Sequence, residues 1–291
     1  MAQVLAVPGD VRHGFAHQTT FNHAFGRITG IAATAIGNIV LCDYDNKHLI
    51  LVNPSGKYLH KLSVESEPYD VAITSQNIGY VTQPNTRSVL RIDPDRMVVL
   101  HKVSSDDLSM SVICASAVPD SGRDIPSKVP CYLGVNVLTS LYAYPVDDYN
   151  IYLSDKNGNM RAVGKAIDPR VVKFHAVDVR TFFSCIGGQN YIKRSKFNLE
   201  YTHLPAEHTV KRIDTMITPT DICSDNYGHI YVSGQGSNNI HRLTQDGKVI
   251  DIPLDSRHGI KQPVALCFNQ NFDKLYVVHE WGTSVLVFDV I

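Results

Sequence analysis

Short apolar runs alternate with polar turns along this chain in an order that recurs. One unit begins at Pro219 with an apolar run, followed by a turn containing Gly, a second run, a polar loop, a third run and another Gly turn. The same order begins at Pro68 and, with a shortened end, at Pro263, and a variant begins at Ile28. Runs rich in Val, Ile and Tyr that end at Gly, Asn, Asp or Pro are typical of short strands joined by tight turns.

The spacing of these units predicts a β-propeller. Their starts lie 40 residues apart at Ile28 and Pro68 and 44 apart at Pro219 and Pro263, within the period of roughly 40 to 50 residues that four-stranded blades show. In the unit at Ile28 the predicted strands are 29–33, 39–42, 48–52 and 57–62. One such sheet cannot bury both its faces, so we expect the sheets to stack around an axis, each covering its neighbour.

The units predict an all-β fold of six four-stranded antiparallel blades. Five units start near Ile28, Pro68, Arg170, Pro219 and Pro263. The segment 108–164 holds more strand-like runs than one blade needs, so the surplus run is expected to form an insertion in the third blade. A seven-bladed propeller with one degenerate blade is the alternative.

The last run of the chain predicts how the ring closes. Residues 284–291 are expected to form a third strand with no fourth strand after them. Residues 3–7 form an unpaired apolar run at the other terminus, so we expect them to supply the outer strand of the last blade. Closure of this kind covers an exposed sheet edge and makes residues 1–291 a single domain.

Composition narrows the class of protein. Hydrophobic residues make up 44% of the chain, enough for a large core, and 27 Lys and Arg against 28 Asp and Glu indicate no preference for a charged partner. No apolar run approaches the roughly 20 residues of a membrane span. The six cysteines form no Cys-x-x-Cys pair, which indicates buried reduced thiols, and there is no Asn-x-Ser/Thr glycosylation site. We therefore expect a cytoplasmic protein with no membrane partner.

The repeats resemble NHL repeats. The segments Thr-Gly-Ile-Ala-Ala-Thr at 29–34, Gly-Asn-Ile-Val-Leu-Cys-Asp at 37–43 and Asn-Lys-His-Leu-Ile-Leu-Val at 46–52 follow that pattern closely. The chain is similar to the C-terminal NHL propeller of tripartite-motif (TRIM) proteins, which implies a target-recognition part of a ubiquitin ligase or an RNA-binding platform. No RING or B-box spacing of Cys and His is present, so any ligase activity would lie outside this chain.

Candidate binding residues lie at one face of the predicted disc. The connections that enter each first strand and those that join second to third strands meet on this side, called here the loop face, and the NHL resemblance implies that it binds the partner. At the starts of inner strands we expect Tyr69, His175 and Thr220, with Asp70 and Asp221 at the next position near the central channel. The second-to-third-strand loops contribute Tyr44, Lys47, Arg87, Gln235, Asn238 and Trp281.

Trp281 is the strongest of these candidates for partner binding, because it is the only Trp of the chain and lies in a Glu-Trp-Gly-Thr loop rather than in an apolar run. Aromatic residues and Arg supply most interface hot spots. Packing across a blade seam is the alternative role for Trp281. Asp70 and Asp221 have one too, as caps for backbone N–H groups around the channel.

Three functions fit this surface. The first is a non-catalytic module that binds a protein or peptide segment. The second is a single-stranded RNA binder in which Tyr44, Tyr69 and Trp281 stack on bases. The third is a Ca²⁺-dependent hydrolase similar to propeller lactonases and phosphotriesterases, with Asp70 and Asp221 as two ligands, although the other inner-strand positions are poor oxygen donors. We favour the first, because no enzyme motif is present, and expect neither a cofactor nor a bound metal.

Overall fold

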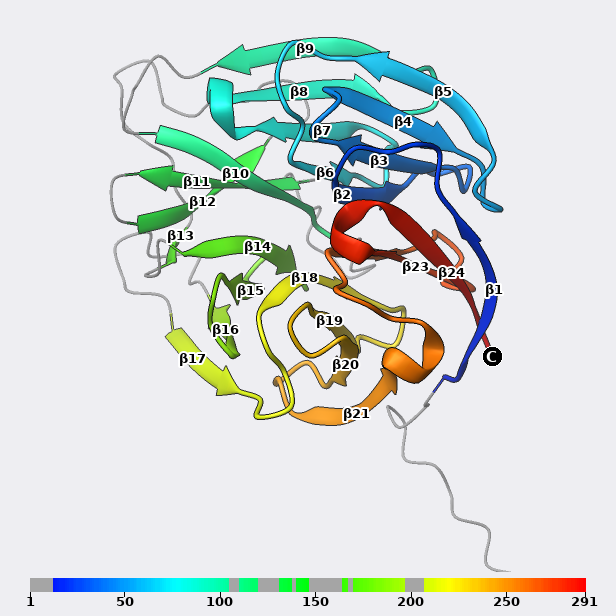
Figure 1. Ribbon diagram of the computed structural model, residues 1–291. Helices are drawn as coiled ribbons and strands as arrows, with labels where there is room; N and C mark the ends of the chain where they lie inside the picture. The colour runs from blue at the N-terminus through cyan, green and yellow to red at the C-terminus, as the bar shows by residue number, and fades with distance from the viewer. Residues whose placement is uncertain are drawn as a thin grey trace, which may run out of the picture.

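The computed structural model describes residues 13–104, 110–119, 131–137, 140–146, 164–166, 170–196 and 207–291. Their strands pair into six antiparallel sheets of four strands each, arranged around a centre (Figure 1). The first three blades are β2 (Ile28–Ala33), β3 (Ile39–Asp43), β4 (His48–Val52) and β5 (Tyr58–Ser63); β6 (Asp70–Ile73), β7 (Gly79–Gln83), β8 (Ser88–Asp93) and β9 (Val98–Ser104); and β10 (Met110–Ala117), β11 (Cys131–Val137), β12 (Ser140–Val146) and β13 (Gly164–Ala166).

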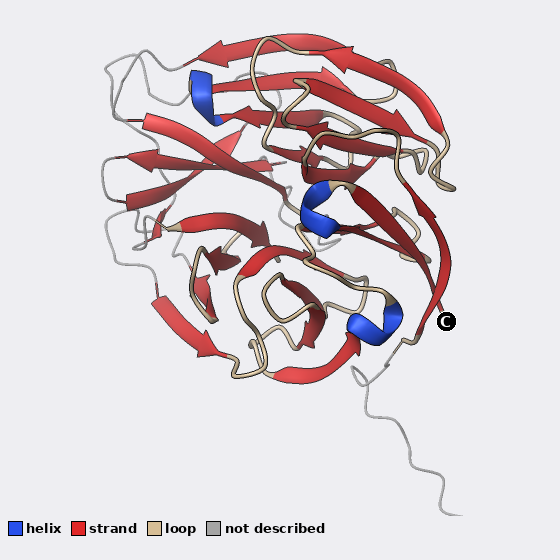
Figure 2. Ribbon diagram, viewed as in Figure 1, coloured by secondary structure: helices blue, strands red, loops and turns tan. Residues whose placement is uncertain are grey.

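The other three blades follow in chain order around the ring. They are β14 (Val171–Ala176), β15 (Thr181–Ile186), β16 (Tyr191–Lys196) and β17 (Glu207–Arg212); β18 (Pro219–Ser224), β19 (Ile230–Gly234), β20 (Asn239–Leu243) and β21 (Val249–Leu254); and β22 (Ala265–Phe268), β23 (Lys274–His279), β24 (Ser284–Val290) and β1 (Phe15–Phe21). Three short 3-10 helices, blue in Figure 2, lie in the connections: η1 (Pro84–Thr86), η2 (Ser256–His258) and η3 (Glu280–Gly282).

The innermost strands form a closed circle. β2, β6, β10, β14, β18 and β22 each contact the next, and β22 contacts β2. No seventh sheet occurs among the described strands, so the seven-bladed alternative is wrong for this part of the chain. The insertion expected in the third blade, around the turn at 118–130, lies almost wholly outside the described residues.

The core lies between the blades rather than within one layer. Six clusters of buried apolar side chains each join two neighbouring sheets, as Ile31 of β2 joins Tyr276 of β23 and Val285 of β24. The hydroxyl of Tyr276 also donates to the carbonyl of Pro54 across that seam, at 2.8 Å. Each sheet therefore covers its neighbour, as the pattern of apolar runs predicts.

The ring closes with a different strand from the one predicted. β1 (Phe15–Phe21) pairs with β24 as the outer strand of the last blade, and residues 3–7 lie outside the described residues. An apolar run is a poor indicator of the closing strand, because outer strands face solvent on one side. β1 reads Phe-Ala-His-Gln-Thr-Thr-Phe and is mostly exposed between its two Phe residues, and β5 is likewise largely exposed.

The prediction of buried reduced thiols is confirmed. All six cysteines are buried and unpaired, and burial raises the pKa of each thiol, as at Cys114 and Cys223. In the described part of the chain, no helix has the length and apolar character needed to cross a bilayer.

Candidate functional site

A row of alternating cations and aromatic rings crosses the loop face toward the channel. The guanidinium of Arg27 lies 4.7 Å from the ring centre of Tyr44, and Tyr44 meets Tyr69 edge to face at 6.4 Å. The ammonium of Lys173 lies 5.3 Å from the ring centre of Tyr69. These four residues, called here the cation-aromatic row, link the first blade to the channel. The two outer contacts each place a cation over a π face, and the middle one is an edge-to-face pair of rings.

Polar neighbours fix the outer half of this row. The side-chain amide of Asn85 donates to the hydroxyl of Tyr44 at 3.1 Å and to the carboxylate of Glu67 at 3.0 Å. Lys47 pairs with the same Glu67 at 3.2 Å. Tyr44, Tyr69 and Lys47, predicted separately from the sequence, are therefore brought together across the seam between blades one and two.

Trp281 lies in the loop whose Gly282 packs against Arg27, the first residue of the row. Its loop, η3, places three consecutive residues in the left-handed region: Glu280 (φ 51°), Trp281 (φ 61°) and Gly282 (φ 96°). Trp281 is 57% exposed. A Cβ on Gly282 would lie 2.6 Å from the carbonyl oxygen of Ile28 and 3.1 Å from Cγ of Arg27, so this loop presses against the start of β2. Bulky residues with φ above zero are uncommon and cost free energy.

A ring of structurally equivalent residues surrounds the channel just below this surface. Asp70 lies opposite Thr82, Lys173 opposite Cys185 and Gly30 opposite Cys42, each 12 positions further along the chain. Asp221 holds the same place, since its amide donates to the hydroxyl of Ser233 as that of Asp70 donates to Thr82. The sixfold repeat thus brings these residues to one level of the channel.

The two aspartates tie neighbouring blades together. Asp70 accepts from the amide of Ala115 in the third blade at 3.1 Å, and Asp221 accepts from Leu266 in the sixth at 2.9 Å. Thr220 serves the same seam, since its hydroxyl donates to the carbonyl of Pro263 at 3.0 Å. The structural role considered for Asp70 and Asp221, capping backbone N–H groups around the channel, is what the geometry shows.

Lys173 adds a buried cation to this ring. Its ammonium donates to Asp70, and both side chains are at least nine-tenths buried. Burial alone would lower the pKa of Lys173, but Asp70 and Asp221 outweigh it and raise the pKa. Burial raises the pKa of Asp221 to about 7, although the attraction of Lys173 opposes the rise; Asp70 adds to it and two backbone amides oppose it.

The ionisation of Asp221 predicts a pH dependence of stability. Because the pKa of its carboxyl rises from 3.8 unfolded to about 7 folded, the folded state holds a proton that the unfolded state loses, and stability falls as pH rises through that window. We expect the free energy of unfolding of the unchanged protein to fall by about 2 to 3 kcal/mol from pH 5 to pH 8. Asp221→Asn is expected to abolish this fall. Urea unfolding of both proteins at the two pH values measures it.

The comparison between pH values matters because asparagine cannot accept from both amides, so the variant loses some stability at every pH. Parallel pH profiles of the free energy of unfolding for the two proteins would show that Asp221 is not the titrating group.

His175 does not lie at the start of an inner strand, where the repeat pattern predicts it. It is the fifth residue of β14, not its first, and its Nε2 contacts the hydroxyl of Ser224 at 2.9 Å in the next blade. Burial lowers the pKa of His175 to about 4, so it is neutral near pH 7. Lys173, two residues earlier, holds the ring position that was assigned to His175.

The remaining candidates lie in second-to-third-strand loops as expected. Arg87 (φ 51°) and Asn238 (φ 52°) each occupy the left-handed position that ends such a loop, as does Lys47. The side-chain oxygen of Asn238 accepts from the amide of Gln262 at 2.7 Å, so Asn238 holds a neighbouring loop. Gln235 directly follows β19 and its amide donates to the carbonyl of Thr218.

Basic side chains on the loop face are mostly neutralised by acidic neighbours. The pairs are Arg27 with Asp45 (3.1 Å), Lys47 with Glu67 (3.2 Å), Arg257 with Asp255 (2.6 Å) and Lys261 with Glu280 (3.5 Å). A phosphate backbone would have to compete with these carboxylates. The field over this face is therefore mixed rather than basic.

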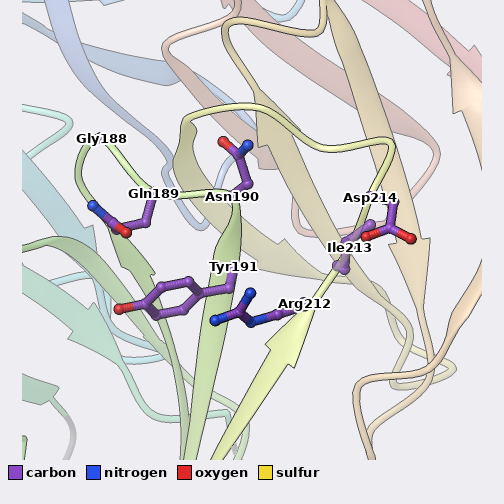
Figure 3. A pocket seen from close by; sticks show the side chains of 7 residues that line it. All are labelled: Gly188, Gln189, Asn190, Tyr191, Arg212, Ile213 and Asp214. Carbon is purple, nitrogen blue, oxygen red and sulfur yellow. The ribbon is translucent and has the colours of Figure 1, made fainter.

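A shallow pocket of about 390 Å³ opens on the loop face at the fourth blade. Figure 3 shows Gln189 and Asn190 on the loop before β16 and the guanidinium of Arg212 beside the ring of Tyr191, while Asp214 points away from them. The hydroxyl of Tyr191 also accepts from Arg170 at 3.3 Å. The pocket is lined mainly by polar side chains.

The hydrolase hypothesis needs a metal site. Within the described ranges no group of three or more His, Cys, Asp or Glu side chains is arranged to hold an ion. Asp70 and Asp221, its expected ligands, accept instead from backbone amides, and Asp70 also from Lys173. Their oxygens are directed to protein donors, which is a poor start for the six to eight oxygen ligands of Ca²⁺.

Sequence comparison adds little to this description. No model of a known protein family matches the chain, and no curated protein matches it. The resemblance to NHL repeats therefore rests on the repeats alone.

Solved structures of similar fold span nearly the whole chain. Virginiamycin B lyase from Staphylococcus aureus has a TM-score of 0.61 at 11% identity, covering 95% of this chain and 100% of that one. The β-propeller domain of Cps50 (Swd1) from Myceliophteria thermophila gives 0.64 at 8% identity, covering 95% and 100%. Hydrazine synthase from Kuenenia stuttgartiensis gives 0.59 at 12% identity, covering 90% and 83%. At these identities the likeness shows the β-propeller fold and no activity.

Proposed function

We propose that this protein is a non-catalytic recognition module that binds a peptide segment of a protein partner on the loop face. The observation that supports this most is the cation-aromatic row together with the exposed Trp281, whose neighbour Gly282 lies against Arg27. Trp, Tyr and Arg are enriched among the hot spots of protein interfaces, and Trp and Tyr bury a large area with only two rotatable side-chain bonds. β-Propellers in general present such a surface of loops for partner binding.

The mixed charge of the loop face supports a protein partner over RNA. Single-stranded RNA binding requires cations that are free to neutralise phosphates, whereas four cations of this face already pair with carboxylates. The NHL-like repeats add the finer proposal that the bound partner is selected as a target for ubiquitin transfer by a domain outside this chain.

Peptides selected from a displayed random library on the intact protein test this proposal. We expect Trp281→Ala to weaken binding of the selected peptides at least tenfold, because a hot-spot side chain contributes about 2 kcal/mol or more. Tyr69→Ala is expected to weaken binding as well. Fluorescence anisotropy of labelled peptides measures the affinity.

Tyr58→Ala is the matched control, because Tyr58 is a 42% exposed aromatic on an outer strand away from the loop face. Equal affinity for the Trp281, Tyr69 and Arg87 alanine variants would refute the proposal. Binding of a uridine 20-mer that falls steeply with salt and is lost in Trp281→Ala would assign the same face to RNA instead.

A further inference from the structure

A larger cavity occupies the central channel and opens on the side opposite the loop face. Its volume is about 760 Å³, within the roughly 300 to 1,000 Å³ of small-molecule sites. First-to-second-strand connections form its mouth, with Ser75, Tyr227 and Gln270, and its inner end reaches Asp70 and Asp221. We call it the channel cavity. It is a different surface from the one proposed above for partner binding.

The walls of the channel cavity are largely apolar. Inner strands contribute small side chains such as Ala32, Ala72 and Ala115, which leave the space open, and rings such as Phe174 and Phe268. A hydrocarbon group placed here would be removed from water, which is favourable by about 25 cal/mol per Å² of apolar surface.

The inner end carries two carboxylates but one cation. Lys173 donates to Asp70, which also accepts from the amides of Val71 and Ala115. The carboxylate of Asp221 accepts from two backbone amides only, and in the described part of the chain no side chain donates to that carboxylate. Asp221 is 9% exposed and lines the cavity. Lys173 attracts Asp221 without donating to it, and a buried carboxylate with no cation in contact is unfavourable, so Asp221 is the group that a further cation would stabilise.

The other groups around Asp221 supply no second cation. Those that act on it or feel its charge are Asp70, Lys173, Tyr69, Cys185, Cys223, Cys267 and Cys114. Burial raises the pKa of the four thiols, so they remain neutral near pH 7. Burial also lowers the pKa of the nearby His175 to about 4. The charge balance of the inner end is therefore set by Lys173 and the two aspartates.

We propose that the channel cavity binds a small primary amine with an apolar stem, its ammonium group placed against Asp221 and its hydrocarbon part against the Ala and Phe walls. The ammonium would give the second carboxylate the cation that Lys173 gives Asp70. The cavity is lined from Tyr227 at the mouth to Asp221 at the inner end, and its volume of about 760 Å³ admits an alkyl or arylalkyl chain. A neutral ligand of the same shape fills the walls and leaves Asp221 uncompensated.

Isothermal titration calorimetry with phenethylammonium and hexylammonium tests this proposal, with 2-phenylethanol and hexanol as uncharged partners of similar shape. At pH 8 we expect the ammonium compounds to bind at least tenfold more tightly than the alcohols. Affinity is expected to fall about tenfold from pH 8 to pH 6, because the ligand competes with the proton on Asp221, whose pKa is about 7. Asp221→Asn is expected to lose at least tenfold in affinity for the amines and none for the alcohols.

Two further variants separate this site from general effects. Asp246→Asn removes the same charge from an exposed turn and is expected to leave amine affinity unchanged. Ala117→Phe fills the cavity wall without touching the inner end and is expected to abolish binding, which keeps the test valid if Asp221→Asn fails to fold. Alcohols that bind as tightly as amines, or amines that do not bind at pH 8, overturn the proposal. Binding of Nα-acetyl-lysine methylamide but of neither small amine would also overturn it and assign the cavity to a partner's side chain.

Discussion

Replacement of Lys173 by methionine is expected to lower the free energy of unfolding by about 3 to 5 kcal/mol at pH 8, which is the usual cost of removing one partner from a buried ion pair. Methionine fills a similar volume, so the loss reports charge rather than a cavity. Asp70 would then be buried with backbone donors alone, and Asp221 would lose the only cation that attracts it among the described groups. Guanidinium denaturation followed by circular dichroism measures the change.

The loss is expected to be smaller at pH 5.5, because protonation of Asp221, whose pKa is about 7, removes one uncompensated charge. Lys102→Met is the control. It removes a cation from an exposed pair with Glu65, whose side chain is 82% exposed, and such pairs contribute about 0 to 1 kcal/mol. A similar small effect for both variants would mean that the Lys173 pair contributes little net stability. Asp70→Asn combined with Lys173→Met should recover part of the loss, since it removes one of the orphaned charges.

The strands of the first blade were predictable because local signals suffice for them. The predicted spans 29–33, 39–42, 48–52 and 57–62 agree with the observed strands at four of their eight ends and differ by one residue at the other four. Turn residues set these limits: Gly37 (φ 88°) and Gly56 (φ 84°) close the two tight turns in conformations that other residues rarely adopt. Periodicity and turn chemistry together specify a four-stranded sheet.

The cluster of charged residues around the channel, Asp70, Lys173 and Asp221, was not predictable from local pattern, because its members lie far apart in the sequence. Asp70 and Lys173 are 103 residues apart and meet because the channel brings equivalent positions of different blades together. One signal was present: a lysine interrupts the apolar run Val171-Val172-Lys173-Phe174, 12 positions before Cys185, as Asp70 precedes Thr82. Aligning the fourth blade on that spacing gives Lys173 rather than His175.

The cation-aromatic row was predicted in part. Tyr44 and Tyr69 were chosen from their loops, but Arg27 precedes the first repeat and carried no signal of its own. Its role follows from the seam between the last and first blades, where Gly282 rests on Arg27 and Ile28. Contacts across a closing seam depend on how the ring ends meet, which no single repeat encodes.

The second large effect on stability is expected at the seam between the last and first blades. We expect Gly282→Ala to lower the free energy of unfolding by about 2 to 4 kcal/mol, the sum of a left-handed backbone that disfavours a Cβ and overpacking against a neighbour that cannot yield. The added Cβ would lie 2.6 Å from the carbonyl oxygen and 2.8 Å from the amide nitrogen of Ile28, and backbone of an inner strand cannot rotate away as a side chain can. Gly259→Ala isolates the first contribution, because Gly259 has nearly the same conformation (φ 84°) with nothing within 4 Å of the added atom. Gly259→Ala is expected to lower the free energy of unfolding by about 1 to 2 kcal/mol. Equal losses for the two variants in urea denaturation would mean that the contact of the added Cβ with Ile28 costs no free energy.

Because Trp281 is the preceding residue, Gly282→Ala should also weaken binding of the selected peptides under conditions where the variant remains folded, whereas Gly259→Ala should not.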